Sequence, residues 1–384
     1  MKCVRSLRCN PCARRRVGDM FNRHMMALAR DSRGETQSDL AEGLSVGQGT
    51  ISKYESGLSL PSDEFVSDMA AYLKYKPGFF YEEGRTLGMP PFHYRKRKKL
   101  GVKTLLKIEA EINIRRMHVS KLMRSYEKLP MLKIPEIDRD EYQGVNRKVY
   151  DIEDIASHLR DKWMIGSGPI PSVIELIERF GGIVIPCDFG TDLIDAMSQR
   201  IDGMPILFFI NINSPADRMR FTLCHEICHM VLHTLDMVND EDMEREADYF
   251  ASALLLPTNE IRPQLRNNFN LRNLANLKSH WKVSMQALAM RASQLELITQ
   301  NQIKTFWIEM SKMGFRKREP NELPRERPRV LRNMIDYHLS NLGYSKEELA
   351  TLLHILPEEI NKLYGDEHFE PLPPKKERVL QLVK

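Results

Sequence analysis

Cys224-His225-Glu226-Ile227-Cys228-His229 lies in an amphipathic segment and places two histidines four residues apart. In an α-helix, residues four apart are separated by about 40° around the axis and about 6 Å along it, so both imidazoles can reach one metal ion. Glu226 is offset by one residue, so its carboxylate reaches a water on the metal rather than the metal itself. Metal-assisted hydrolysis needs this arrangement, because the ion lowers the pKa of the water toward about 7 and a carboxylate takes its proton.

A third metal ligand separates this interpretation from the alternative, a helix with two histidines and no metal. A catalytic zinc site takes three protein ligands and keeps one open position. We favour Glu246, which precedes the apolar stripe of a second helix, while Glu244 and His233 are the alternatives. Asp248 is a weaker candidate for a residue that fixes a histidine tautomer. The stripe comprises Ala247, Phe250, Ala251 and Leu254.

These residues resemble a known family. The run 220–233, followed by 246–257, is similar to the ImmA/IrrE family of bacterial and phage metallopeptidases. The resemblance covers about residues 150–262. It implies zinc ligation by His225, His229 and Glu246, with Glu226 as general base, and a role in cleaving transcriptional repressors. In that family Ala and Gly usually occupy the positions of Cys224 and Cys228. We interpret both as small buried residues rather than as redox or metal-binding thiols.

A second pattern lies near the N-terminus. Leu40-Ala41, Val46, Ile51 and Tyr54 follow offsets of 0, +6, +11 and +14, which packs two helices across a tight turn. Thr36 is the expected N-cap of the first helix. Polar side chains that suit a helix in the major groove open the first helix or face outward on the second. These candidate DNA contacts are Gln37, Gln48, Thr50, Ser52 and Lys53.

This block resembles the Cro/CI-type (Xre) helix-turn-helix family over about residues 20–83. The resemblance implies sequence-specific binding of double-stranded DNA, usually as a homodimer on a palindrome. A helical protein-interaction domain is the alternative. The same offsets recur from Leu277 and from Leu349, where we expect packed helix pairs more often than further DNA contacts.

Charge and hydropathy limit the classes of protein. The 384 residues carry a formal net charge of +5, with basic residues crowded before residue 24 and in the run Arg95–Lys99. Such runs repel themselves and favour an anionic partner, which phosphate contacts would supply. No apolar run approaches the roughly 18 residues that span a bilayer, and no secretory signal is recognisable. We therefore expect a cytoplasmic protein without a membrane partner.

Short strands precede the histidine helix. Residues 181–186, 194–200 and 205–212 have strand character, and Asp202-Gly203 forms a hairpin turn between the last two. The strand at 206–212 could lie at a sheet edge and pair with an extended peptide, or be a core strand. The stretch 195–198 is a weaker candidate for lining the cleft. The expected fold class is α+β and mostly helical.

The chain divides into five segments. We expect a disordered basic tail (1–19), a five-helix helix-turn-helix domain (20–84), a basic helix and linker (85–148), a zinc metallopeptidase domain (149–262) and a helical C-terminal region (263–384). The leading hypothesis is a DNA-binding regulator with a zinc endopeptidase that cleaves a repressor or another regulatory protein. The alternative is a repressor or antitoxin whose metal domain senses a ligand or holds a partner without cutting.

Overall fold

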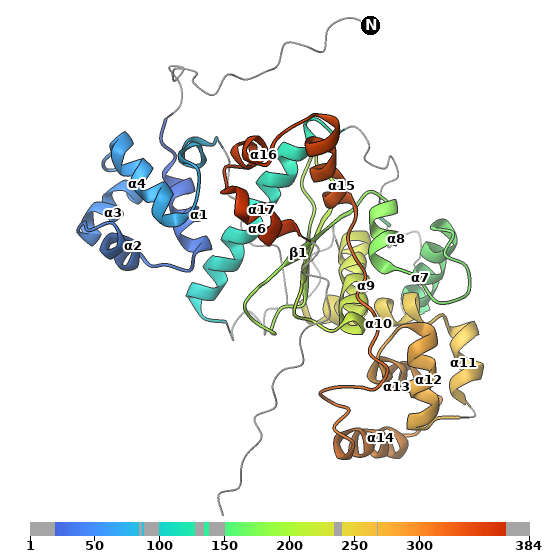
Figure 1. Cartoon of the computed structure of the whole chain (residues 1–384). Helices are drawn as coiled ribbons and strands as arrows, with labels where there is room; N and C mark the ends of the chain where they lie inside the picture. Colours follow the sequence, from blue (N-terminus) through green and yellow to red (C-terminus); the bar gives the residue numbers. More distant parts are fainter. Residues whose placement is uncertain are drawn as a thin grey trace, which may run out of the picture.

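The computed structural model describes residues 20–83, 87, 100–126, 134–137, 150–233, 240–266 and 268–365. Three expectations concern residues outside these ranges: the basic tail at 1–19, the basic run Arg95–Lys99 and most of the linker at 127–148. In the described part, helices surround one three-stranded sheet, in agreement with the predicted α+β class (Figure 1).

The N-terminal module, residues 20–83, contains four α-helices and a final 3-10 helix. Thr36 caps its second helix and forms a capping box with Asp39, as the sequence predicts. Gly57 ends the third helix in the left-handed conformation, at φ 77°. The expected fifth helix is thus a single 3-10 segment, which starts at a proline. The elements are α1 (Arg23–Ser32), α2 (Gln37–Gly43), α3 (Gln48–Ser56), α4 (Asp63–Leu73) and η1 (Pro77–Tyr81).

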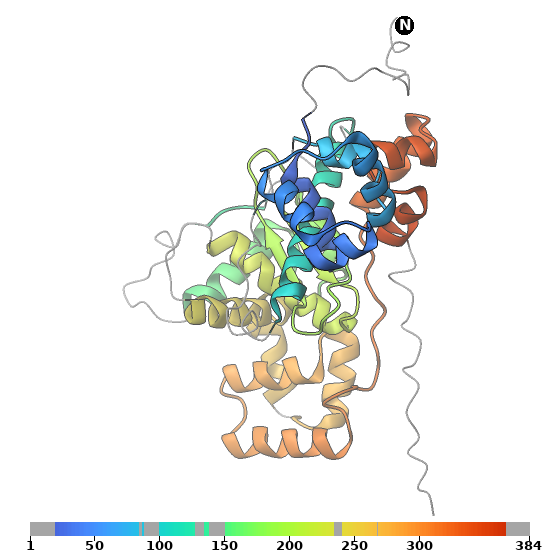
Figure 2. The ribbon, with the colours of Figure 1, turned by 90° about the vertical axis from the view of Figure 1, so that its left-hand side faces the viewer.

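A long helix, α6 (Val102–Met123), follows this module and lies at the centre of the molecule. We expected it as a basic helix leading into a linker, but Ile108, Val119 and Leu122 are almost fully buried. It packs against α1 on one side and the C-terminal helices on the other (Figures 1 and 2). Its apolar residues thus belong to the core rather than to a solvated connection.

The sheet consists of β1 (Ile183–Cys187), β2 (Ala196–Gln199) and β3 (Leu207–Asn211), in the order β1-β3-β2. All three predicted strands form. β2 and β3 are antiparallel neighbours, and Gly203 in the turn between them has a φ of 76°. β1 runs parallel to β3. The strand considered for the sheet edge, β3, is therefore the central strand, and β2 lies at an edge.

Each face of the sheet contributes to a different hydrophobic cluster. Val184, Phe208 and Ile210 pack toward α8 (Val173–Arg179) and α9 (Ala216–Leu232). Two further helices, α7 (Tyr150–Lys162) and α10 (Asp240–Leu255), belong to that cluster, and so do the helices between residues 258 and 312.

The opposite face presents Ile185, Met197 and Phe209 to α6 and the C-terminal helices. Those helices are α15 (Val330–Asp336), the π-helical segment η3 (Tyr337–Asn341), α16 (Lys346–Leu353) and α17 (Pro357–Tyr364). The buried residues of the N-terminal module belong to the same cluster as this face of the sheet.

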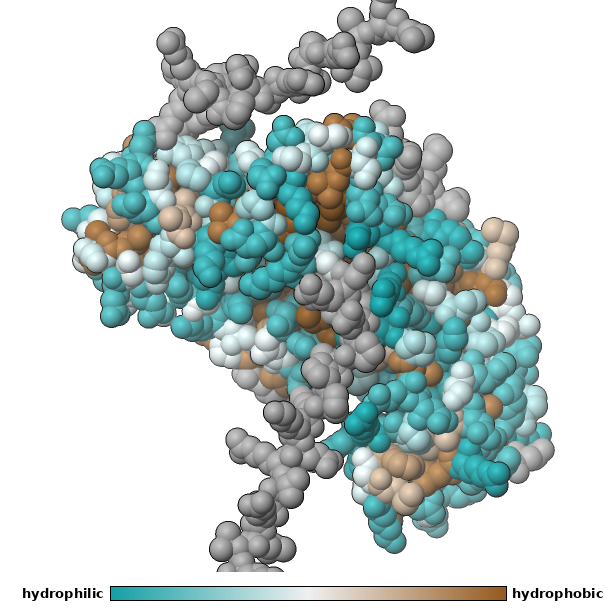
Figure 3. All heavy atoms as spheres, viewed as in Figure 1, coloured by the Kyte–Doolittle hydropathy of each residue, from teal (hydrophilic) through white to brown (hydrophobic). Residues whose placement is uncertain are grey.

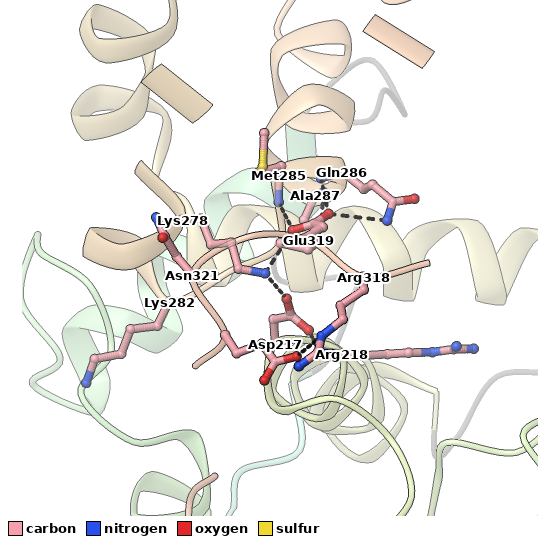
Figure 4. Close-up of polar contacts among 12 residues, drawn as sticks. Asp217, Arg218, Lys278, Lys282, Met285, Gln286, Ala287, Arg318, Glu319 and Asn321 are labelled. Carbon is pink, nitrogen blue, oxygen red and sulfur yellow. Dashed lines mark hydrogen bonds and ion pairs between the residues drawn. The ribbon is translucent and has the colours of Figure 1, made fainter. Parts of the chain in front are cut away.

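Four helices lie below the sheet in Figure 2 and extend the same hydrophobic cluster: α11 (Thr258–Arg266), α12 (Leu271–Trp281), α13 (Met285–Gln294) and α14 (Gln300–Lys312). A buried ion network attaches them to α9 (Figure 4). The ammonium of Lys278 lies 2.5 Å from Asp217 in the first turn of α9 and 2.9 Å from Glu319. Glu319 also accepts the backbone N–H of Met285 at 2.7 Å, where α13 begins.

The segment between α14 and α15 is held by polar contacts to residues at and just before α9. Its Arg325 donates to the carbonyls of Ile212 and Ser214, next to the start of α9. Glu326 pairs with the buried Arg220 of α9. The segment thereby carries the chain from the four-helix layer back to α6 (Figure 1).

The two later stretches with helix-turn-helix spacing form helix pairs, α12–α13 and α16–α17. In the first pair, α13 buries Leu288 and Arg291. In the second pair, Ile360 and Tyr364 of α17 point into the core. Packing of this kind accounts for the recurrent spacing in both pairs.

Most of the surface in Figure 3 is hydrophilic, with scattered apolar patches, one of them over the end formed by α12–α14. Met290, Ile308 and Met313 are exposed large apolar residues of that layer. Among the described helices, none combines the length and the hydropathy that a membrane crossing requires.

Candidate metal centre and nucleic-acid interface

His225 and His229 lie one turn apart on α9, as their spacing predicts. Their Nε2 atoms are 3.0 Å apart. Two nitrogens bound to one zinc ion at about 2.1 Å each would be about 3.4 Å apart in a tetrahedral site, so this approach fits a shared ion. Glu244 completes the group, with carboxylate oxygens 3.4 Å from Nε2 of His225 and 3.5 Å from Nε2 of His229. One ligand atom from each residue lies within 4.8 Å of the others.

Glu246, the residue favoured from sequence, is not part of this group. Its carboxylate lies 3.2 Å from Nε2 of His233. The reason is helical periodicity: Glu244 and Asp248 are four residues apart and share the face of α10 that meets α9, whereas Glu246 is rotated by about 200° from Glu244. The acid pair and the histidine pair have the same four-residue spacing, and this signal in the sequence, which the preference for Glu246 does not use, points to Glu244.

The outer ring nitrogens of both histidines also have partners. Nδ1 of His225 lies 2.9 Å from the carboxylate of Asp248. Nδ1 of His229 lies 2.8 Å from Nδ1 of His233, whose other nitrogen faces Glu246. Such contacts fix ring orientation and tautomer and leave each Nε2 available as a metal ligand. Asp248 therefore lies where its suggested tautomer-fixing role requires, and His233 supports His229 from behind.

The charges around the pair suit a cation. Burial by itself would lower the pKa of His225, but Asp248, Glu244 and Glu226 outweigh it and raise that pKa to about 10. Burial would raise the pKa of Glu244, but hydrogen bonds to His225 and His229 hold it well below its usual range. The site thus concentrates negative charge around the two imidazoles, which a divalent cation would neutralise.

Glu226 follows His225 directly and faces the sheet. Its side chain is buried, and Oε2 lies 2.5 Å from the hydroxyl of Ser198 in β2. The stretch 195–198 thus contributes a direct contact to the expected base. The neighbouring thiols of Cys224 and Cys228 are fully buried, and burial raises the pKa of Cys224 to about 12. A protonated buried thiol behaves as a small apolar group, which agrees with the interpretation from sequence.

The expected DNA contacts gather on α3 and the start of α2. Gln48 and Lys53 are exposed, and Thr50, Ser52 and Gln37 are half-buried. Gln48 donates to the side-chain oxygen of Gln37 at 2.8 Å.

A series of hydrogen bonds from inside the N-terminal module supports these two glutamines. Gln37 donates to Glu55 at 2.7 Å, and Glu55 accepts from Arg30 at 2.7 Å. The two glutamine side chains are therefore ordered before any ligand binds, which reduces the entropy lost on binding.

Comparisons with protein families match two parts of the chain. A helix-turn-helix family model matches residues 26–80, within the expected bounds of 20–84. The model of the IrrE N-terminal-like domain of the peptidase family M78 matches residues 177–293, which runs past the expected end at 262 and through α13. No curated protein matches the chain. The chain therefore joins, in this order, a helix-turn-helix domain of the Xre type and an IrrE N-terminal-like metallopeptidase domain.

Proposed function

We propose that this protein is a cytoplasmic DNA-binding regulator whose second domain is a zinc endopeptidase that cleaves a repressor or another regulatory protein. The observation that carries the proposal is the convergence of His225, His229 and Glu244, with Glu226 one residue from the first histidine. Three ligands leave a fourth position of a tetrahedral ion for water, as in catalytic rather than structural zinc sites.

The residues of the chain have distinct roles in this proposal. His225, His229 and Glu244 hold the ion, and Asp248 and His233 orient the two imidazoles. When bound, zinc would polarise the scissile carbonyl and acidify its water. Glu226 accepts the proton of the attacking water and later donates it to the leaving amine. Because Oε2 of Glu226 is bonded to Ser198, Oε1 is the atom left to take that proton.

We place the peptide substrate along the edge of β2 that faces away from β3. Among the described residues, β3 is the strand that pairs with β2, which lies at the edge of the sheet and against α9. An extended peptide added to this edge would gain main-chain hydrogen bonds, which give affinity with little dependence on sequence. The sequence suggests β3 for this role, but β3 is the central strand, so we assign the peptide to its neighbour β2.

The helix-turn-helix domain would bring the peptidase to its target. In this proposal Gln48 and Gln37 read base edges, while Lys53 and the hydroxyls of Thr50 and Ser52 contact the duplex beside them. A homodimer would place two α3 helices in successive major grooves of a palindrome. Tethering on DNA raises the local concentration of a promoter-bound substrate.

The decisive experiment compares protein N-termini in cells that express the native chain or Glu226→Gln. The substitution removes the base but keeps the shape, so zinc content and DNA binding should be unchanged. A new N-terminus that depends on the native chain would identify both the activity and the substrate. Identical N-termini, with zinc and DNA bound in both, would instead support a regulator whose metal domain senses a ligand or holds a partner.

A further inference from the structure

Ser198 is a polar residue on a face of the sheet that is otherwise apolar. Side chains alternate along β2, so Ala196 and Ser198 point toward α9 while Met197 points into the opposite core. Ser198 pairs with Phe208 in the register of the sheet and is 4% exposed. A buried hydroxyl is tolerated when it has a hydrogen-bond partner, and a residue of this kind calls for one.

The partner is Glu226. The hydroxyl of Ser198 lies 2.5 Å from Oε2 of Glu226, whose side chain is 7% exposed. An ionised carboxylate can only accept hydrogen bonds, so Ser198 donates. Because one oxygen of the carboxylate is bonded to the strand, rotation about the last side-chain bond of Glu226 is restrained.

We propose that Ser198 is a positioning residue for Glu226: its hydroxyl holds Oε2 and so directs Oε1 at the reacting water. The inference rests on the proposed peptidase function and names a further residue needed for it. When Oε1 takes the proton, Oε2 remains a hydrogen-bond acceptor, so the Ser198 hydroxyl donates to it both before and after the proton transfer. The strand supplies rigidity, because the backbone of β2 is paired with β3 at this position.

The chain offers a matched control in Ser214. This serine is also buried, and its hydroxyl donates to a carboxylate, that of Asp195, at 2.9 Å. Ser198→Ala and Ser214→Ala therefore remove the same group from similar surroundings, but only the first removes a contact to Glu226.

The first measurement is steady-state cleavage, by the full-length zinc-loaded chain, of the substrate found from the comparison of N-termini. We expect Ser198→Ala to lower kcat by about 10- to 100-fold, because small misplacements of a reacting group have costs of this order. KM and zinc affinity should stay at native values, and Ser214→Ala should match the native kcat. Equal kcat values in the two alanine variants would overturn the proposal.

The second measurement needs no cleavage. Unfolding temperatures of metal-free native chain, Ser198→Ala, Glu226→Ala and the double variant form a cycle that isolates the pair. We expect the double variant to unfold close to Glu226→Ala, because the serine then has no carboxylate to hold. Additive shifts would show that the hydroxyl does not restrain Glu226, and the positioning role would fall. If the changes in unfolding temperature are non-additive but the native chain cleaves no protein, the contact between Ser198 and Glu226 stands and the proposed peptidase function is wrong.

Discussion

At the scale of single residues, the metal centre depends on a choice between two acids on α10. Glu244 faces both Nε2 atoms, while Glu246 reaches only His233. The two glutamates are two residues apart, so one helix cannot present both to the same ion without a distortion. The identity of the third ligand therefore depends on which face of α10 is turned toward α9. Truncation of each glutamate in turn tests which of the two binds the ion.

Glu244→Ala should weaken zinc binding by more than 100-fold, beyond the roughly 10- to 100-fold typical of losing a residue that only supports a ligand. Glu246→Ala should weaken it by about 10-fold or less, because it acts through His233 on His229. Competition with a chromophoric chelator measures both affinities. The opposite ranking would make Glu246 the ligand and would require α10 to turn relative to α9.

At the scale of elements, α3 presents two kinds of exposed side chain for the proposed DNA contact, an amide and an ammonium group. Gln48 is exposed at the first position of the helix and is oriented by Gln37, whereas Lys53 is exposed near its end. A side chain that reads base edges affects discrimination between sequences, while one that contacts phosphates affects all sequences alike.

Gln48→Ala should therefore reduce discrimination between the operator and its point variants by about 1–3 kcal/mol at one base position. Lys53→Ala should weaken binding to all duplexes and reduce the slope of log affinity against log salt by about one. Binding titrations over a salt series, on an operator selected from random duplexes, separate the two effects. Uniform weakening by Gln48→Ala would remove it from the reading surface.

The ion network between α9 and α12 gives a second prediction for an element. Lys278 is 2% exposed and neutralises both Asp217 and Glu319, so Lys278→Ala leaves two carboxylates without their cation. We expect it to lower the free energy of unfolding by about 3 kcal/mol in urea titrations. Arg332→Ala, which breaks the exposed pair with Asp336 on α15, should cost less than about 1 kcal/mol. Similar losses in both variants would contradict the role given to Lys278.

Local signals made many elements predictable from the sequence. Thr36 and Asp39 mark the start of α2, and Asp202-Gly203 marks the turn that pairs β2 with β3. The four-residue spacing that brings His225 and His229 together is likewise contained within about one helical turn. In each case the residues that determine the structure lie within a few positions of one another.

Long-range contacts were not predictable in this way. The strand order depends on the parallel pairing of β1 with β3, which no local pattern encodes. The burial of α6 depends on helices more than two hundred residues later in the chain. The rotation of α10 about its axis, which directs Glu244 rather than Glu246 at the two histidines, depends on how α9 and α10 pack. The apolar stripe of α10 alone does not determine this rotation.

At the scale of the whole molecule, a buried histidine links the central helix α6 to α17, the last described helix. His118 of α6 lies 2.5 Å, at Nδ1, from the hydroxyl of Tyr364 in α17. Burial, with smaller contributions from Lys121 and Arg115, lowers the pKa of His118 to about 3. Docking of α17 thus requires a neutral imidazole.

This has a defined pH dependence. Between pH 6.5 and 3 the unfolded chain binds a proton at His118 that the folded chain excludes, so stability is complete above pH 6.5 and falls as the pH drops. From pH 6.5 to pH 5 the loss is about 2 kcal/mol. Urea unfolding at both pH values, compared with His118→Gln, isolates this contribution. An equal loss in the variant would assign the acid sensitivity to other groups.

The core that α6 shares with the N-terminal module and the sheet has a consequence for where the protein can act. A module that packs into the same core as the sheet cannot rotate freely, so the proposed metal site would face one fixed direction from a bound duplex. B-DNA completes a turn in about 10.5 base pairs. A partner bound nearby would meet the site only when the two binding positions are separated by a suitable fraction of a turn. Five added base pairs would carry that partner to the far side of the duplex.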